Sequence, residues 1–368
     1  MSVLKDKYYT KQIITYLGNK RSLLREIEPM IIKVKKKLNK EKLITADLFS
    51  GSGVVSRLLK KHSSLVIAND LEKYSKLINE CFLANKSDFD ADEFNKMLIK
   101  LNKRIIEEPI EGIIAKNYAP KNDNNIQKNE RVFYTRENAI YIDSFRYHID
   151  KIIPENLKKY FLALLITEAS IHVNTSGVFK GFYKDKDTGI GKFGGTDENA
   201  LSRIKSKIII EEPVLANDES EYLIYQADAI KLSKILQETD LVYLDPPYNQ
   251  HPYGSNYFML NIIIDNEVPR ETSKVSGIPS NWNRSPFNKK AEALTSMEKI
   301  VRNLKTKYII VSYNNEGFIL FDEMENMLKK YGNVESKQIK YNTFRGSRNL
   351  NGRDTHTQEY LFLLEKEA

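Results

Sequence analysis

Five short apolar runs constrain the fold of this 368-residue chain more than any other feature of its sequence. Each run is about as long as a buried strand, and helical segments follow several of them. Buried strands that alternate with helices are typical of α/β proteins, in which the sheet is mostly parallel. The runs cover residues 44–49, 65–69, 222–226, 240–244 and 308–312.

The two ends of the chain add a hairpin and a helix to this pattern. Residues 359–364 form one more apolar run, and residues 336–341 are its expected hairpin partner. Apolar residues recur at close to helical spacing over residues 22–38, which predicts an amphipathic helix that contains Pro29 and bends there. The lysines of this helix are expected to form a solvated face.

A long stretch between the second and third runs interrupts the alternation of strands and helices. We therefore expect two domains: a discontinuous one that carries the sheet, residues 1–74 and 221–368, and an inserted, largely helical one, residues 75–220. The insertion ends in a loop rich in glycine, lysine and aromatic residues, residues 176–195. Loops on a rigid scaffold often carry specificity, so the insertion is a candidate recognition module.

The charge and cysteine content narrow the classes of function. A formal net charge of +8 and a pI near 9.1 favour a polyanionic partner, nucleic acid before an anionic membrane, although a merely soluble basic protein stays open. Cys81 is the only cysteine, so no intrachain disulfide can form. With neither a signal peptide nor a membrane-spanning run in the sequence, we expect a cytoplasmic protein.

The histidines and glycines exclude two common kinds of site. The five histidines are widely spread and none lies in a pattern that typically binds metal, so we expect no metal site. The sequence also lacks the glycine-rich lysine motif of proteins that hydrolyse nucleoside triphosphates.

A glycine turn follows the first apolar run. Residues 47–53 read Asp-Leu-Phe-Ser-Gly-Ser-Gly, and a helical segment follows directly. The glycines allow a tight turn and a close approach of a ligand to the backbone, and the helix N-terminus attracts anionic groups. Asp70, which ends the next strand, is placed to accept hydrogen bonds from ribose hydroxyls. A dinucleotide site and a turn with no ligand remain open for this pattern alone.

The tetrapeptide Asp245-Pro246-Pro247-Tyr248 follows directly on the fourth run, at the strand edge where α/β sheets bind ligands. The prolines stiffen the loop and leave it with carbonyl acceptors but no amide donors. A rigid loop with a carboxylate, a carbonyl and an aromatic ring can hold a planar base that carries an amino group. The alternative is a Pro-Pro turn that ends the strand, with Asp245 as a local cap and no ligand.

Adenine N6 is a poor nucleophile because its lone pair is delocalised into the ring. If the Asp245 carboxylate and the Pro246 carbonyl accept its two hydrogens, the nitrogen moves toward tetrahedral geometry and can attack a methyl group in line. Tyr248 can stack on the base. A base inside a duplex must first be flipped out of the helix, which costs a few kcal/mol.

Together, these motifs resemble those of the Dam-like adenine-specific DNA methyltransferases. Residues 16–21, Tyr-Leu-Gly-Asn-Lys-Arg, are similar to the first cofactor motif of that family, and residues 47–53 match its glycine motif. The motif order is also that of the family. The resemblance implies a Rossmann-like class I methyltransferase with a seven-stranded sheet, in which the insertion reads the DNA sequence.

The resemblance also implies a set of functional residues. The catalytic residues would be Asp245, Pro246 and Tyr248. The residues expected to contact S-adenosylmethionine are Tyr16, Lys20, Asp47, Phe49, Gly51, Gly53, Asp70, Asp228 and Asp245. Apart from the resemblance, two basic loops supply candidate DNA contacts, although ordinary exposed loops stay open as the alternative: Lys180, Tyr183, Lys184, Lys192, Arg345 and Arg348.

The sequence therefore predicts site-specific methylation of adenine N6 in double-stranded DNA, by base flipping and in-line transfer. The expected setting is a restriction–modification system with a cognate restriction endonuclease. Three rivals remain at this stage: a methyltransferase for amino groups of RNA bases, a non-catalytic DNA-binding relative and a nucleotide-dependent oxidoreductase. The last explains the glycine turn and Asp70 but gives the Asp-Pro-Pro-Tyr loop no task.

Overall fold

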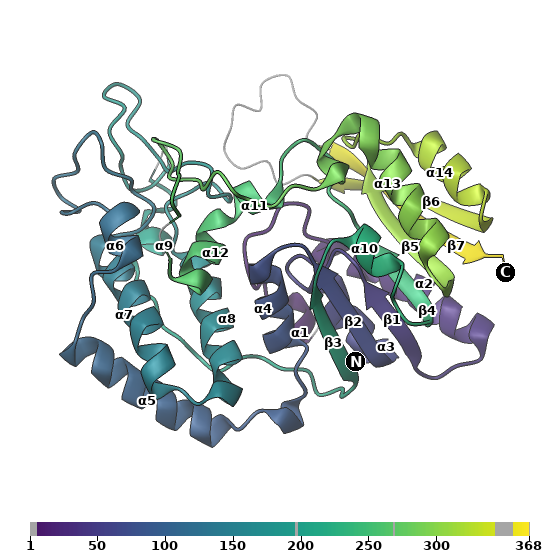
Figure 1. The fold of residues 1–368 in the computed structure, drawn as a ribbon, viewed down its shortest axis with the longest axis horizontal. Coiled ribbons are helices and arrows are strands. Elements are labelled where there is room, and N and C mark those ends of the chain that lie inside the picture. Colours follow the sequence, from purple (N-terminus) through teal and green to yellow (C-terminus); the bar gives the residue numbers. More distant parts are fainter. Residues whose placement is uncertain (1–5, 196–197, 268, 343–355, 368) are drawn as a thin grey trace.

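The computed structural model describes residues 6–195, 198–267, 269–342 and 356–367. A seven-stranded sheet with the order β3-β2-β1-β4-β5-β7-β6 lies at the centre of one half of the molecule (Figure 1). Its strands are β1 (Leu43–Asp47), β2 (Ser63–Asp70), β3 (Glu221–Gln226), β4 (Thr239–Leu244), β5 (Thr306–Asn314), β6 (Gly332–Asn342) and β7 (His356–Lys366).

The strand pairing confirms both the strands that the sequence predicts and their mostly parallel arrangement. Strands β3, β2, β1, β4 and β5 pair in parallel, whereas β7 runs antiparallel to both β5 and β6. The carboxyl ends of the five parallel strands therefore share one edge. The glycine turn, Asp70 and the Asp-Pro-Pro-Tyr loop all follow strands at that edge.

Helices cover both faces of the sheet because successive side chains of a strand point to opposite faces. Val242 and Leu244 of β4 pack in one apolar cluster, and Leu241 and Tyr243 pack in another. The first cluster includes helices α10 (Ala229–Ser233), α13 (Lys290–Asn303) and α14 (Phe321–Lys329). The second includes helices α1 (Lys7–Thr10), α2 (Leu24–Leu38) and α3 (Val54–His62).

Helix α2 matches the amphipathic helix expected over residues 22–38, preceded by the short 3-10 helix η2 (Arg21–Leu23). The α-helix continues through Pro29 to Leu38. Its lysines include Lys33 and Lys37, which form ion pairs with the hairpin of β6 and β7. This part of the lysine-rich run is thus a solvated face whose lysines pair with glutamates of the neighbouring strands.

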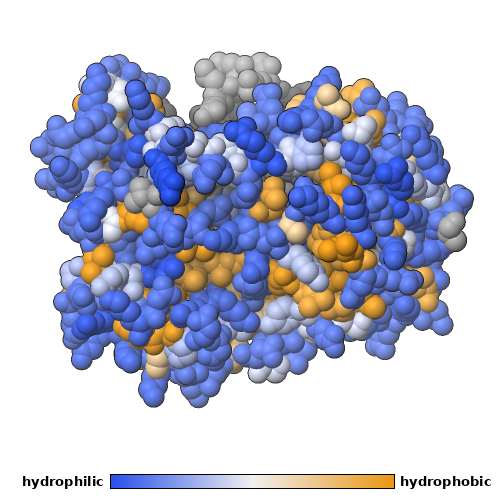
Figure 2. Space-filling model, viewed as in Figure 1, coloured by the Kyte–Doolittle hydropathy of each residue, from blue (hydrophilic) through white to orange (hydrophobic). Residues whose placement is uncertain are grey.

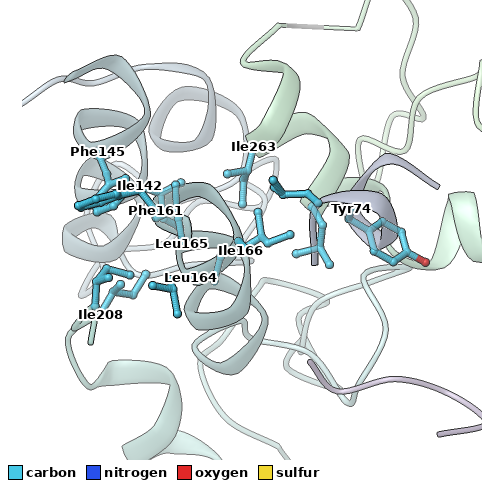
Figure 3. Close-up of a cluster of buried hydrophobic side chains, with 14 of the residues drawn as sticks. Tyr74, Ile142, Phe145, Phe161, Leu164, Leu165, Ile166, Ile208 and Ile263 are labelled. Atoms are coloured by element: carbon cyan, nitrogen blue, oxygen red, sulfur yellow. The ribbon is translucent and has the colours of Figure 1, made fainter. Parts of the chain in front are cut away.

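A second layer of helices lies beside the sheet and has its own apolar core. Its elements are η3 (Lys86–Asp88), α5 (Ala91–Glu107), α6 (Ile113–Asn117), α7 (Arg136–Ile152), α8 (Glu155–Ile171) and α9 (Leu201–Lys205). Helix α4 (Lys73–Phe82) contacts β2 and β3 on one side and α8 on the other, so it joins the two halves. Figure 3 shows the helical core, with Tyr74 of α4 at its edge.

The stretch after β4 contributes to both halves. Its short helix α11 (Tyr253–Asn256) leads into α12 (Phe258–Asp265), which packs against α4, α7 and α8, and a 3-10 helix η4 (Pro286–Asn288) then packs beside α13. Ile263 of α12 and Ile166 of α8 belong to the same buried cluster (Figure 3). The division into residues 1–74 with 221–368 and residues 75–220 stays a prediction.

Hydrophilic residues cover most of the molecular face shown in Figure 2. Within the described part of the chain, no helix is both long enough and apolar enough to cross a membrane. Residues 160–170, an apolar stretch of the sequence, lie in helix α8, and most of them are buried in the helical core.

Candidate active site

The glycine turn between β1 and α3 requires glycine at two positions. Gly51 and Gly53 have φ angles of 50° and 75°, a region that L-residues with a side chain rarely adopt. A Cβ on Gly51 would lie 2.7 Å from the Tyr16 ring, and one on Gly53 would lie 2.8 Å from Asn79 Oδ1. The turn is therefore closely packed against its neighbours and keeps a fixed shape.

Asp70, at the end of β2, braces this turn. Its Oδ2 accepts a hydrogen bond from the Gly51 amide at 2.8 Å, and its Oδ1 accepts one from the Glu72 amide at 2.9 Å. Burial raises the pKa of Asp70, while these amide donors act in the opposite direction. The carboxylate is thus oriented by backbone at the edge of the sheet.

Asp47, at the end of β1, is buried beside the same turn. It accepts a hydrogen bond of 2.6 Å from the Ser56 hydroxyl of α3. Burial raises the pKa of Asp47 to about 7, against the lowering effect of Ser56. The ring of Phe49, two residues later, packs edge-on against the ring of Phe287 of η4, with ring centroids 5.3 Å apart. This contact places the stretch after β4 next to the turn.

The N-terminal segment of residues 16–20 is held by Tyr253 of α11 and by Tyr257, which lies between α11 and α12. The Tyr16 ring stacks on Tyr253 and on Tyr257, each with ring centroids 4.9 Å apart. Tyr257 accepts a hydrogen bond from the Leu17 amide at 2.8 Å, and Tyr253 donates one to the Leu17 carbonyl at 3.0 Å. Helices from beyond β4 thus fix the segment that carries Lys20.

Lys20 lies buried between two carboxylates. Its Nζ is 3.2 Å from Asp245 Oδ1 and 3.5 Å from Glu359 Oε2, and its side chain is 4% exposed. The same Nζ lies 5.8 Å from the centroid of the Tyr248 ring. The three charged side chains come from the N-terminal segment, the loop after β4 and strand β7, so the fold assembles them from distant parts of the sequence.

The electrostatics of this cluster follow from burial and charge. Burial raises the pKa of Asp245 to about 6; the Lys20 ammonium opposes this rise and the Glu359 carboxylate adds to it. Burial lowers the pKa of Lys20, but Asp245 and Glu359 outweigh it and raise the pKa above its ordinary value. Lys20 therefore carries its charge at neutral pH, and Asp245 is mostly ionised there.

Two cavities meet at this cluster. The first encloses about 930 Å³, including space open to solvent, and its walls come from the glycine turn, the ends of β2 and β3, the N-terminal segment and η4. The second encloses about 1800 Å³ on the same basis, and Tyr248, Glu359, Arg21 and His251 are among its lining residues. Asp245 lines the first cavity and Tyr248 the second, so the Asp-Pro-Pro-Tyr loop separates them.

The first cavity brings together most of the cofactor contacts that the sequence predicts. The predicted residues that line it are Tyr16, Lys20, Asp47, Phe49, Gly51, Asp70, Asp228 and Asp245. Gly53 does not line it and instead forms the N-cap of α3. Asp228 caps α10 by accepting a hydrogen bond from the Lys231 amide at 2.9 Å.

The predicted catalytic residues lie in one loop but in different surroundings. Tyr248 faces the second cavity, Asp245 faces the first, and Pro246 between them is buried and lines neither. Phe318 donates its amide to the Tyr248 carbonyl at 3.0 Å, which ties the loop to the segment after β5.

The predicted DNA contacts fall into three groups. Lys180 and Lys184 are exposed. Burial lowers the pKa of His251, and the nearby charge of Lys180 lowers it further. Lys192 and Tyr183 are half-buried, and Tyr183 packs against a small apolar cluster of the insertion. Arg345 and Arg348 lie outside the described residues.

Three site residues are missing from the sequence-based prediction. Tyr253 and Glu359 line the cavities, and Glu72 lies buried in the wall of the first, where it accepts a hydrogen bond of 2.9 Å from Asn261. A signal existed for Glu359, a lone acid at the start of an otherwise apolar run. Among the described residues, no group of three or more His, Cys, Asp or Glu side chains is arranged to hold a metal ion.

A sheet of this order, with a glycine turn after its first strand and a cavity at its carboxyl edge, defines a Rossmann-like methyltransferase. Comparison with known families makes the assignment more specific. Residues 16–327 match the model of the D12 class N6 adenine-specific DNA methyltransferases, and this chain belongs to that family.

Several curated proteins are similar to this chain over most of its length. Type II methyltransferase M.NlaIII of Neisseria lactamica is 30% identical over 364 residues, which cover 96% of this chain and 99% of that protein. Type II methyltransferase M.CviAII of Paramecium bursaria Chlorella virus 1 is 29% identical, with 87% of this chain and 89% of that protein covered. Type II methyltransferase M.FokI of Planomicrobium okeanokoites is 27% identical over 96% of this chain, which spans about half of that longer protein.

Proposed function

We propose that this adenine-specific DNA methyltransferase transfers a methyl group from S-adenosylmethionine to adenine N6 in double-stranded DNA, with the target base flipped into the second cavity. One observation carries the proposal. The Asp245 carboxylate lines the first cavity, and Tyr248 of the same loop lines the second. A donor of a methyl group and its acceptor can therefore approach each other from opposite sides of one loop.

The first cavity fits S-adenosylmethionine by its donor set. Asp47, Asp70 and Asp228 supply acceptors for a cation, a ribose and an amino group. Phe49 and Phe287 supply an apolar wall suited to a flat ring.

When bound, S-adenosylmethionine supplies an electrophilic methyl group on a sulfonium. In our proposal the glycine turn lets the ligand approach its backbone, and Asp70 accepts hydrogen bonds from ribose hydroxyls. Lys20 stays paired with Asp245 and faces the ligand from the N-terminal segment. The remaining predicted contacts, Tyr16, Gly51 and Gly53, act by shaping the turn and its cover.

The Asp-Pro-Pro-Tyr loop would hold the target amine. The Asp245 carboxylate and the Pro246 carbonyl accept the two hydrogens of N6, which localises the nitrogen lone pair and directs it toward the first cavity. Tyr248 stacks on the base. Because the second cavity is wide, it can receive a flipped adenine without movement of the sheet.

Basic residues around the second cavity would contact the DNA backbone. Lys180 and Lys184 are exposed in the loop of the insertion, and Arg21 and His251 line the cavity itself. Phosphate contacts of this kind position a duplex and contribute no sequence information. In our proposal Tyr183 and Lys192 support this loop, and Arg345 and Arg348 reach the same DNA.

A restriction–modification system is the proposed setting. The names of three relatives describe them as type II methyltransferases, and StsI of Streptococcus sanguinis is named a modification methylase. We propose by analogy that a restriction endonuclease for the same DNA site is the partner of this chain.

The experiment that tests the reaction is methyl transfer from labelled S-adenosylmethionine to unmethylated mixed-sequence duplex DNA, with structured RNA in parallel. After digestion to nucleosides, mass analysis should find N6-methyladenine in the DNA sample only. Methyl groups found in the RNA sample, or on cytosine, would contradict the proposal.

A further inference from the structure

Glu359 is a buried carboxylate that the proposed chemistry leaves without a task. It lies on β7 opposite Asn314 of β5, and its side chain is 6% exposed. The residues that follow it on the strand, Tyr360 to Leu364, are buried and apolar. A buried carboxylate destabilises a fold unless a charge partner compensates it.

The partner of Glu359 is Lys20, which Asp245 shares. The ammonium lies 3.2 Å from Asp245 Oδ1 and 3.5 Å from Glu359 Oε2, so it is held from two directions. Among the described residues, Lys20 is the side chain that pairs with the Asp245 carboxylate, through Oδ1. The second oxygen of Asp245 is therefore left for another donor.

The cluster holds one positive charge against two negative ones. Other ionisable groups face Asp245 as well. They are Asp47 at the end of β1, Tyr243 on β4, Tyr248 of the same loop and Tyr253 of α11. The tyrosines are neutral at physiological pH because their pKa values are raised, chiefly by burial. Glu359 is thus the second carboxylate, besides Asp245, that forms an ion pair with Lys20.

We propose that Glu359 is a positioning residue for methyl transfer, which holds the Lys20 ammonium against one oxygen of Asp245 and keeps the other oxygen available for the target amine. The inference rests on the proposed function, because it takes Asp245 as the acceptor of the N6 hydrogen. Glu359 itself lines the second cavity, on the side where the base would enter. Its charge also offsets that of Lys20, so the site keeps a negative charge toward a cationic ligand.

The first test compares Glu359→Gln and Glu359→Asp in single-turnover methyl transfer across pH. Gln removes the charge, so Lys20 stabilises ionised Asp245 more strongly. The acid limb of the rate should then shift by about one pH unit to lower pH. Asp keeps the charge but withdraws it from Lys20. The acid limb of the pH–rate profile of Glu359→Asp should therefore stay near that of the wild type. Its plateau rate should fall by about tenfold, as expected when the carboxylate is misplaced.

Glu365→Gln is the matched control, because Glu365 lies on the same strand but pairs with exposed Lys37, away from both cavities. Thermal unfolding midpoints of all variants check that they fold. If Glu359→Gln keeps the acid limb and the rate of the wild type, Glu359 is only a structural ion-pair partner and the inference is wrong.

A binding measurement separates this inference from the proposed function. Calorimetry should show that Glu359→Gln weakens the binding of S-adenosylmethionine by roughly threefold to tenfold. The binding of neutral S-adenosylhomocysteine should be unchanged, because only S-adenosylmethionine is a cation. Equal changes for both ligands, or none, would contradict the role of the Glu359 charge. This readout holds even if the wild type methylates a base other than adenine, which would contradict the proposed function alone.

Discussion

In the proposed mechanism, the chemistry of this enzyme depends at the residue scale on the protonation state of one carboxylate. Asp245 would have to be ionised to accept hydrogens from an amine, yet its side chain is only 17% exposed. The neighbouring Lys20 limits the cost of this burial without removing it, because Glu359 competes for the same ammonium. The pKa of this acceptor carboxylate therefore lies close to neutral pH.

This balance predicts how the rate depends on pH. Since the pKa of Asp245 is raised to about 6, methyl transfer should be level above about pH 7 and fall below pH 6, as the carboxyl gains a proton. Single-turnover rates from pH 5 to 8, with cofactor and DNA in saturating amounts, measure this limb. A rate that stays level down to pH 5 would show that Asp245 does not have to ionise in this range.

A second residue-scale prediction concerns the exposed Lys180. If it contacts a phosphate, Lys180→Ala should weaken binding to duplex DNA of any sequence and lower the slope of log Kd against log salt by about 1. Lys299→Ala, on an exposed face of α13, is the control and should leave the slope unchanged. Equal slopes for both variants would remove Lys180 from the DNA interface.

At the scale of elements, the site is built where strands end and turns begin. Six strands were predictable because each contains a short apolar run, and the polar strand β6 was predictable as the hairpin partner of β7; all seven are present. The glycine turn, Asp70 and Asp245 were predictable for the same reason, since the carboxyl edge of a parallel sheet collects them.

Other parts of the site were not predictable from local sequence. Tyr253 and Tyr257 hold the segment of Lys20 only because α11 and α12 return to it from beyond β4, and no spacing in the sequence encodes that return. Glu359 stands out as a lone acid at the start of an apolar run, but its pairing depends on Lys20 lying beside the first residues of β7, which the local sequence does not encode.

The glycine turn gives the prediction that belongs to this scale. Gly51→Ala should weaken S-adenosylmethionine binding by tenfold or more and destabilise the fold by roughly 1–2 kcal/mol, because φ is positive and the new Cβ meets the Tyr16 ring. Gly189→Ala is a matched control, with a φ of 68° and open space around its Cβ position. Calorimetry and urea unfolding measure both effects. If the two variants bind the cofactor alike, the packing of the turn on Tyr16 does not matter for the cofactor.

At the scale of the whole molecule, two cores meet around the first cavity. Helix α4 joins the sheet to the helical layer, and Glu72 at its start accepts a hydrogen bond from Asn261 of α12. Loss of this contact would loosen the cover of the cavity as well as the junction of the two cores.

Glu72 makes this junction sensitive to pH. Burial, and next the Asp70 charge, raise the pKa of Glu72 to about 7, so the folded state holds its proton more tightly than the unfolded chain. Its contribution to stability is therefore full below the unfolded pKa and is lost as pH rises toward 7. Glu72→Gln should be more stable relative to wild type at pH 8 than at pH 5, by on the order of 2 kcal/mol. Urea unfolding at the two pH values measures this, and an equal difference at both would contradict it.

The central claim is that Asp245 accepts the hydrogens of the target amine. The most direct test is single-turnover methyl transfer to duplex DNA by Asp245→Ala, with nucleosides identified by mass. Asp240→Ala, at the opposite end of the same strand and paired with Lys40, serves as the control. We predict N6-methyladenine from the wild type and the control, and a rate at least about a hundredfold lower for Asp245→Ala despite bound cofactor. N6-methyladenine formed by Asp245→Ala at a rate near that of the wild type would contradict the account.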